Sequence, residues 1–275
     1  MTRRHFLYAS AASAAGVCFY TWRFEPHWLE IVRRRLPIRG LPPGLEGLTL
    51  AQVSDVHVGP RVDDEYVLDV FRRVTALQPD IVVLTGDLVS HHDGVFEQME
   101  SVYREFPRGR LATVGVLGNH DYGPGWSYPE VAARVATVAT RAGIQILRNE
   151  VVNVHGLQIA GMDDWWAQQF RPDAALARLD KRQASLVLSH NPDTVDLPGW
   201  DGYEGWILSG HTHGGQCKAP FLPPPLLPVR NRRYTAGEFS LAENRSLYIS
   251  RGVGHLLRVR INVRPEVTLF ELQRG

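Results

Sequence analysis

Five short apolar runs in this chain each end in a cluster of small polar, acidic or histidine residues. The runs cover residues 48–54, 81–85, 111–117, 185–188 and 206–208. Between the first two, residues 63–78 place apolar side chains on one face at helical spacing, and Pro79 ends that pattern. Strands that alternate with helices predict an α/β fold with partly parallel sheets.

Further elements follow from the same patterns. Helices are expected over 95–106, 129–142 and 172–180, and strands over 144–147, 151–154, 157–161, 246–250 and 267–272. Residues 219–229 hold too many prolines for a helix or a central strand, so a loop is expected there. The 275 residues, 44% of them hydrophobic, suit one globular domain with a sizeable core or two small ones.

Charge and cysteine usage exclude some classes of protein. A formal net charge of +1 gives no support to a nucleic-acid partner. The two cysteines, Cys18 and Cys217, provide no disulfide framework, because Cys18 lies in the amino-terminal apolar stretch.

The amino terminus has the features of a targeting segment. The pair Arg3-Arg4 directly precedes an apolar stretch, rich in Ala and Ser, that runs to Trp22. This arrangement resembles a bacterial twin-arginine export signal, and the alternative is a basic start to an ordinary buried helix. We expect residues 1–22 to be a signal or membrane anchor, 23–45 a linker and 46–275 the functional domain, which places the protein in the bacterial cell envelope. Arg33-Arg34-Arg35 would form a solvated face or contact anionic headgroups.

The polar clusters at the ends of the five runs favour a metal centre. In chain order they contain Asp55 and His57, Gly86-Asp87, Gly118-Asn119-His120-Asp121, His190, and Gly210-His211-Thr212-His213. Ligands of α/β sheets bind outside the carboxyl ends of the strands, so the clusters should converge. Imidazole, carboxylate and amide ligands suit Mn, Fe or Zn better than Ca. Paired ions about 3.5–4 Å apart typically serve phosphate-ester hydrolysis.

Three of the clusters have ordinary structural explanations when taken alone, whereas Gly118-Asn119-His120-Asp121 and Gly210-His211-Thr212-His213 are more particular. Asp55-x-His57 could be a surface pair, Gly86-Asp87 a turn, and His190 a satisfied interior histidine. All five clusters in this order, each after a strand, are hard to obtain from turns alone.

Together these motifs resemble the signature of the calcineurin-like metallophosphoesterase superfamily over residues 48–272. The resemblance implies two facing mixed β-sheets flanked by helices in a four-layer α-β-β-α arrangement. It also implies two divalent metal ions, one held by Asp55, His57, Asp87 and His213, the other by Asp87, Asn119, His190 and His211. A hydroxide bridging the ions would attack phosphorus, and His120 would contact the phosphate and assist the leaving group. Asp121 would either orient His120 or cap a turn.

The branch of the superfamily is narrowed by residues outside the metal signature. Gly86-Asp87 continues as Leu-Val-Ser, which departs from the Asp-Arg-Gly extension of the protein serine/threonine phosphatases. Gly214-Gly215-Gln216, Asp163-Asp164 and the stretch 251–254 resemble exported or membrane-associated phosphodiesterases related to UDP-2,3-diacylglucosamine pyrophosphatases. Five side chains could line the substrate side, although a structural role is favoured for each: His91, His92, Asp164, Arg251 and His255.

The sequence is compatible with more than one substrate. The apolar loop 221–228 follows two proposed ligands and would either contact lipid or pack on its own domain. A phosphodiesterase acting on a possibly lipid-linked ester is favoured. An exported enzyme would not meet cytoplasmic UDP-linked lipid precursors, so another envelope diester is then expected. The alternatives are an exported phosphomonoesterase or nucleotidase, and a non-catalytic metal-binding envelope module.

Overall fold

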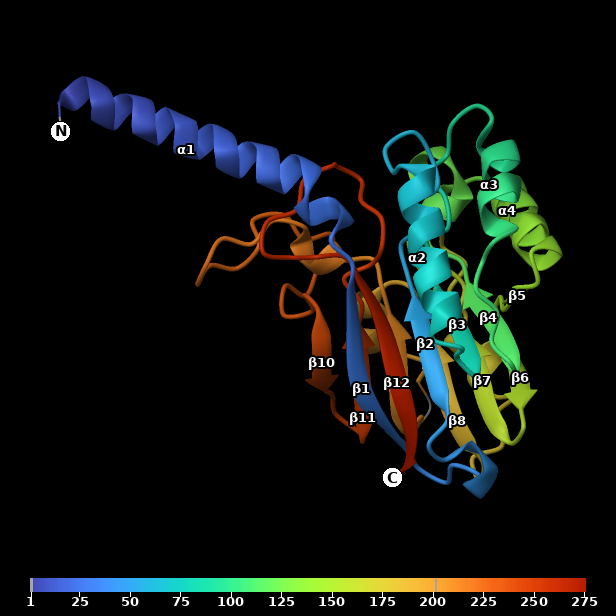
Figure 1. Cartoon of the computed structure of the whole chain (residues 1–275). Helices are drawn as coiled ribbons and strands as arrows, with labels where there is room; N and C mark the ends of the chain where they lie inside the picture. The colour runs from blue at the N-terminus through green and yellow to red at the C-terminus, as the bar shows by residue number, and fades with distance from the viewer. Residues whose placement is uncertain (1, 201) are drawn as a thin grey trace.

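Two six-stranded sheets face each other in the computed structural model, which describes residues 2–200 and 202–275 (Figure 1). The first sheet contains, in spatial order, β1 (Glu30–Ile38), β12 (Glu266–Arg274), β2 (Thr49–Val53), β3 (Ile81–Thr85), β4 (Ala112–Val116) and β5 (Gln145–Ile146). The second contains β10 (Gly237–Ser240), β11 (Arg245–Ile249), β9 (Gly205–Ser209), β8 (Ala184–Leu188), β7 (Leu157–Gly161) and β6 (Glu150–Val154). This confirms the two facing sheets that the family resemblance implies.

Parallel pairing brings the carboxyl ends of the central strands to one edge. In the first sheet β2, β3 and β4 run parallel, and in the second β7, β8 and β9 do so. β12 runs antiparallel to β2, which makes the first sheet mixed. The loops that leave β2, β3, β4, β8 and β9 therefore gather at a shared edge.

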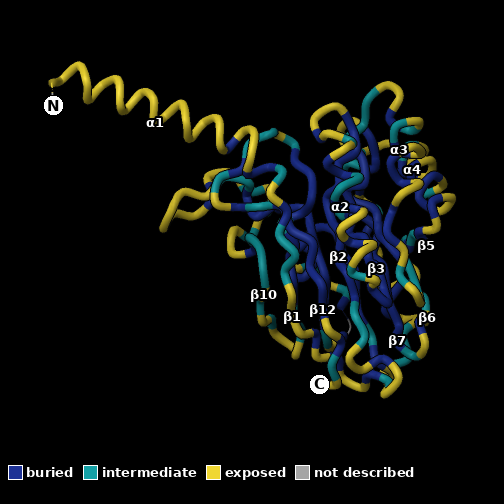
Figure 2. The backbone as a smooth tube through the Cα atoms, viewed as in Figure 1, coloured by how far each residue is buried: buried dark blue, intermediate teal, exposed yellow. Residues whose placement is uncertain are grey.

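The alternation of side chains along the strands fills two apolar layers. Leu50, Ile81 and Val83 point into the core between the sheets, together with Leu186 and Leu208 of the second sheet. The next residues along the strands of the first sheet point to its outer face. The central strands are buried over nearly their whole length (Figure 2).

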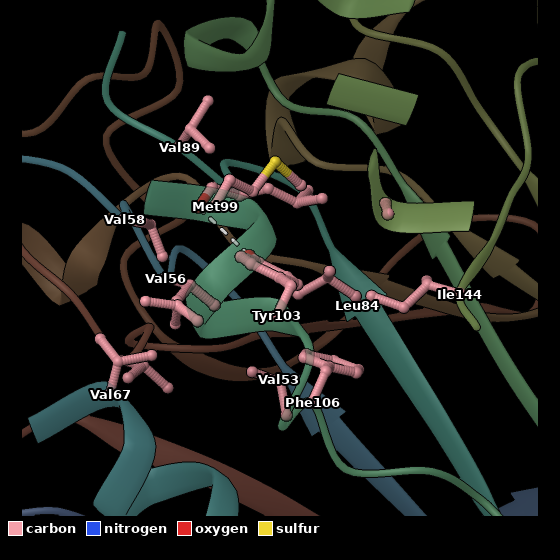
Figure 3. Packing of buried hydrophobic residues seen from close by; sticks show 14 of the residues in the cluster. Val53, Val56, Val58, Val67, Leu84, Val89, Met99, Tyr103, Phe106 and Ile144 are labelled. Carbon is pink, nitrogen blue, oxygen red and sulfur yellow. Dashed lines mark hydrogen bonds between the residues drawn. The ribbon is translucent and has the colours of Figure 1, made fainter. Parts of the chain in front are cut away.

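Helices cover the outer face of the first sheet. These are α2 (Asp64–Ala76), α3 (Val95–Tyr103) and α4 (Pro129–Arg141). Met99 and Tyr103 of α3 belong to the same buried cluster as Val53 and Leu84 of the sheet, and the Tyr103 hydroxyl donates to the Leu88 carbonyl at 3.1 Å (Figure 3). The helical periodicity of these segments thus buries one face of each helix.

Shorter helices complete the chain. On the outer face of the second sheet α5 (Pro172–Leu176) contributes Ala175 and Leu176 to a third apolar cluster. The single-turn helices are η1 (Glu25–His27), η2 (Pro43–Leu45), η3 (Asn119–Tyr122), η4 (Pro124–Trp126), η5 (Pro192–Asp196) and η6 (His213–Gly215).

The prediction of a linker over 23–45 is wrong, because a strand of the first sheet lies within it. Residues Glu30–Ile38 form β1, which pairs with β12 in parallel over all nine residues, and Leu36 and Ile38 are buried in the core between the sheets. Arg33, Arg34 and Arg35 are exposed on this edge strand. Three consecutive charges interrupt the apolar pattern that would predict this strand. The charges suit an edge strand because they discourage pairing with another chain.

The amino-terminal helix α1 (Arg3–Arg23) projects away from the domain (Figure 1). Its aromatic side chains are largely exposed, with Phe6 59% and Phe19 53% accessible. Within residues 2–200 and 202–275, no helix is both long and apolar enough to cross a membrane.

Candidate metal centre

The side chains at the shared sheet edge leave the strands on strained backbone. Asp55, His57, Asp87, His211 and His213 all have left-handed φ angles, of 52°, 53°, 53°, 70° and 49°. Such angles are uncommon for residues other than glycine and cluster at functional sites, where the surrounding structure holds them. Each of these residues follows the end of β2, β3 or β9 by two to four positions.

Asp55, His57 and His213 form the first of two groups. Their ligand atoms lie within 4.8 Å of one another, and all three residues are buried. Nε2 of His57 is 3.1 Å from Nε2 of His213, which in turn lies 3.5 Å from Oδ1 of Asp55. A carboxylate and two imidazoles in this arrangement can hold one divalent cation.

Asp87, His190 and His211 form the second group. Their ligand atoms also lie within 4.8 Å of one another, and all three are buried. Nε2 of His190 is 3.2 Å from Oδ2 of Asp87 and 3.1 Å from Nδ1 of His211.

The Asp87 carboxylate joins the two groups. Its Oδ2 is 3.2 Å from Nε2 of His190 and also 3.4 Å from Nε2 of His57 in the first group. Its Oδ1 accepts a hydrogen bond of 2.9 Å from the backbone N–H of His120. One oxygen of Asp87 therefore faces both groups while the other is fixed.

Backbone carbonyls set the tautomers of the second group. Nδ1 of His190 is 2.8 Å from the Thr85 carbonyl, and Nε2 of His211 is 2.7 Å from the Pro228 carbonyl. A carbonyl only accepts, so each of these nitrogens carries a proton. The opposite nitrogens then aim at each other and at the Asp87 carboxylate. Such a meeting of electron-rich atoms calls for positive charge between them, and carbonyl-oriented histidines are typical of metal ligands.

The protonation states agree with this requirement. Burial lowers the pKa of His57 and His211 to about 3, so both imidazoles stay neutral with a free lone pair. Burial opposes ionisation of Asp87, but His190 and His120 hold its pKa well below the usual value. Burial also disfavours the charged form of His190, yet Asp87 raises its pKa to about 10. The second group thus favours a cation at His190, which a metal ion supplies by displacing the proton.

Asn119 supplies a further potential ligand. It is buried with 1% of its surface accessible, and its side-chain oxygen and nitrogen both lack a hydrogen-bonding partner among the described residues. An unpaired buried amide costs free energy unless another group binds it. A metal ion beside the second group would satisfy the amide oxygen, so the residues present fit a two-metal centre.

His120 differs from the other histidines of the site. It is half-buried, and its ring centroid lies 5.0 Å from that of His57. It belongs to neither metal-type group in the described chain. A half-buried histidine at the rim can contact a substrate bound over the metals.

Asp121 has a structural role. Its Oδ1 accepts from the backbone N–H groups of Leu88 and Val89 at 2.8 and 3.1 Å, and its Oδ2 accepts from Gly118 N–H at 2.8 Å. These bonds clamp the loop after β3 to the loop after β4. Of the two expected roles for Asp121, the structure therefore supports the cap.

The five expected substrate-side residues mostly have structural partners. Arg251 pairs with Glu266 and Glu30, His255 bonds the Arg61 carbonyl, and His92 bonds Gln98. The ring of His91 lies 6.2 Å from that of Phe96. Asp164 caps its own turn through Ala167 N–H, but within residues 2–200 and 202–275 its Oδ2 has no partner.

Two residues beside the centre are functional candidates that the sequence does not predict. Trp126 and Trp166 lie beside the centre, with the Trp166 ring 4.4 Å from His211 and the Trp126 ring 6.2 Å from His120. Trp126 ends the single-turn helix η4 and Trp166 lies in the turn after β7, and a tryptophan at either position carries no chemical signal in the sequence alone.

The chain is similar to proteins of one known family and to several bacterial relatives. Residues 48–215 match the calcineurin-like phosphoesterase family. The chain is 32% identical to phosphodiesterase YaeI of Escherichia coli K12, over 99% of each protein. It is 30% identical to the uncharacterized metallophosphoesterase YkuE of Bacillus subtilis 168, over 99% of this chain and 98% of that protein. It is 27% identical to UDP-2,3-diacylglucosamine pyrophosphatase LpxG of Chlamydia muridarum, over 95% of each.

Proposed function

Because this chain belongs to the calcineurin-like phosphoesterases, a family of metal-dependent hydrolases, we propose that it is a two-metal phosphodiesterase of the cell envelope. The observation that carries this proposal is the place of Asp87 Oδ2, within 3.4 Å of ligand nitrogens from both groups. A shared carboxylate between two sets of imidazoles suits a pair of ions better than a single one.

The proposed ligand sets follow the two groups. Asp55, His57, Asp87 and His213 would hold the first ion, and Asp87, Asn119, His190 and His211 the second. Nitrogen ligands outnumber carboxylates, which favours Mn, Fe or Zn as the ions.

The protein's own residues then perform distinct steps. When bound, the two ions would polarise the phosphate and lower the pKa of water. Hydroxide would then be available at neutral pH to attack phosphorus. His120 sits at the half-buried rim, where its imidazole would donate a hydrogen bond to the phosphoryl oxygens or a proton to the leaving oxygen. The Asp87 Oδ1 bond to His120 N–H ties the position of His120 to that of the shared ligand.

A lipid-linked substrate is proposed from the loop that follows the last ligands. In this loop Phe221 is fully exposed, and Leu222 and Leu226 are 59% and 74% accessible. The Pro228 carbonyl of the same loop accepts from His211, so the loop adjoins the centre directly. Exposed apolar side chains so close to a metal ligand would suit a membrane surface or an acyl chain.

Export or membrane attachment through α1 is part of the same proposal. The helix carries Arg3 and Arg4 at its start and exposed aromatics such as Phe6 and Trp22 along its length. It projects from the domain as an export signal or interfacial anchor would (Figure 1).

A substrate panel tests the proposed reaction. Protein purified with Mn²⁺ is assayed on bis-p-nitrophenyl phosphate and on p-nitrophenyl phosphate, with Asp87→Ala and His120→Ala alongside. We expect faster turnover of the diester and strong losses in both variants. Preference for the monoester would replace the proposal with a phosphomonoesterase, and equal rates in the three proteins would refute a metal-dependent active site.

A second experiment tests whether the apolar loop 221–228 binds a membrane surface. Leu226→Ser with Leu227→Ser should weaken binding to anionic vesicles and slow turnover of vesicle-bound diesters, while a soluble diester is turned over as before. Unchanged vesicle binding and turnover would remove the lipid surface from the proposal.

A further inference from the structure

Two tryptophans form a wall along one side of the metal centre. The ring centroids of Trp126 and Trp166 lie 4.6 Å apart with an interplanar angle of 33°. Trp166 stands edge-to-face with the His211 ring at 4.4 Å, and Trp126 lies 6.2 Å from the His120 ring. The pair thus extends from a residue of the second group to the histidine at the rim.

Packing of the hydrophobic core does not account for Trp166. Within residues 2–200 and 202–275 it belongs to none of the three buried apolar clusters, whereas its neighbour Trp165 packs against the third. Trp165 also lies under the Arg230 guanidinium at 4.7 Å. Trp166 is half-buried, so part of its ring is accessible.

The turns that carry the wall hold it in place. Asp164 Oδ1 accepts from Ala167 N–H at 2.7 Å, and its carbonyl accepts from Gln169 N–H at 2.9 Å, which closes the turn around Trp166. Trp126 has a left-handed φ of 58°, an outlier for so bulky a residue. Strain retained at such a position is typical of functional sites. The turn that carries Trp166 is therefore closed by hydrogen bonds, and Trp126 also packs against the first apolar cluster.

We propose that Trp126 and Trp166 bind a flat ring in one substituent of the phosphodiester, such as a nucleobase. A rigid indole stacks on another flat ring with little loss of freedom, which favours a ring over a flexible acyl chain. The wall flanks His120 and His211, so a ring stacked there would be joined to the phosphate at the metals. This inference rests on the proposed phosphodiesterase function and adds the class of substituent.

Two diesters with the same leaving group test the inference. Thymidine 5′-(p-nitrophenyl phosphate) and methyl p-nitrophenyl phosphate both release p-nitrophenolate and differ only in the retained substituent. The measurement is the ratio of their kcat/KM values with Mn²⁺ present. We expect the wild type to favour the thymidine ester and Trp166→Leu to reduce that ratio about tenfold, the scale of one base stacked on one ring. Trp166→Phe should keep most of the ratio, and Trp165→Leu is the matched control on the same turn.

The possible results distinguish binding of a flat ring from the phosphodiesterase function on which it rests. A wild-type ratio near one would overturn the inference. Equal losses of kcat/KM on both esters in Trp166→Leu would also overturn it, because they would mean that Trp166 only supports His211. In both cases turnover of the methyl ester by the wild type would leave the phosphodiesterase proposal standing. Failure of the wild type to hydrolyse either ester would reject both.

Discussion

Asp87 and His190 come from different sheets, yet Oδ2 of Asp87 lies 3.2 Å from Nε2 of His190. Asp87 follows β3 of the first sheet and His190 follows β8 of the second. The second metal group therefore forms only when the two sheets pack together, and the core between them sets its geometry. Metal binding by this group would therefore depend on the tertiary fold.

Metal content should depend on whether a substitution affects one group or both. His213→Ala removes a ligand of the first group, and His211→Ala one of the second, so each should lower bound metal from about two ions to about one per chain. Asp87→Ala should lower it further because Asp87 contacts both groups. Elemental analysis of the purified proteins measures this, with Asp69→Asn on the exposed face of α2 as control. Equal metal loss in all three variants would argue against a shared ligand.

His120→Ala should reduce turnover without reducing metal content. The ring lies at the rim and outside both groups in the part of the chain that the structure describes. Loss of a general acid typically lowers rates by about 10²- to 10⁴-fold. Steady-state assays on a diester together with metal analysis test this, with the exposed His155→Ala as the matched control. A His120→Ala protein that loses metal in proportion to activity would show a ligand instead.

Asp121→Asn should destabilise the fold. Burial raises the pKa of Asp121, and its two oxygens accept three backbone hydrogen bonds from two loops. An amide offers a single acceptor oxygen and sets an N–H group against a backbone N–H, a cost of about 1–3 kcal/mol in the free energy of unfolding. Urea unfolding of the metal-free proteins measures this cost. A stability equal to that of the wild type, with altered catalysis, would favour the role of orienting His120.

Chelation should lower the melting temperature. Ligands that bind only the folded state stabilise it, by about 2.7 kcal/mol per site at a hundredfold excess over Kd. For a domain of this size each kcal/mol corresponds to roughly 2–4 °C. We expect a fall of at least about 5 °C on adding EDTA to the Mn²⁺-loaded protein, and almost none for Asp87→Ala. An identical fall in both proteins would place the stabilising metal elsewhere.

Asp80 should stabilise the protein in a pH-dependent way. Burial opposes its ionisation, but hydrogen bonds from Thr49 and Arg110 outweigh burial and hold its pKa below the usual value. A depressed folded pKa contributes stability that is complete above the unfolded pKa of about 3.9 and is lost as pH falls through the folded pKa. Asp80→Asn should therefore cost about 1–3 kcal/mol equally at pH 7 and pH 5, and less near pH 3. A cost that grows on acidification would contradict this sign.

The sequence predicts the central strands and the polar residues that follow them, because burial on both faces leaves long apolar runs and each run ends in residues of unusual chemistry. It does not predict β1, whose arginines Arg33–Arg35 obscure the strand pattern. It also does not predict β10, which alternates half-buried and exposed residues at an edge.

At the site, the sequence identifies the residues that form both metal groups but not their surroundings. The carbonyls of Thr85 and Pro228 that orient His190 and His211 carry no side-chain signal. Trp126 and Trp166 lie 40 residues apart and meet only through the fold. Contacts of this kind depend on tertiary packing, which single-sequence patterns do not contain.

Titration of metal-free protein with Mn²⁺ tests the central claim most directly. Bound metal and hydrolysis of bis-p-nitrophenyl phosphate are followed in the same samples. The account predicts that turnover rises with the second equivalent of metal and is absent from Asp87→Ala at any loading, since Asp87 faces both groups. Full turnover with one equivalent or none, or no diester hydrolysis at two, would contradict a two-metal phosphodiesterase.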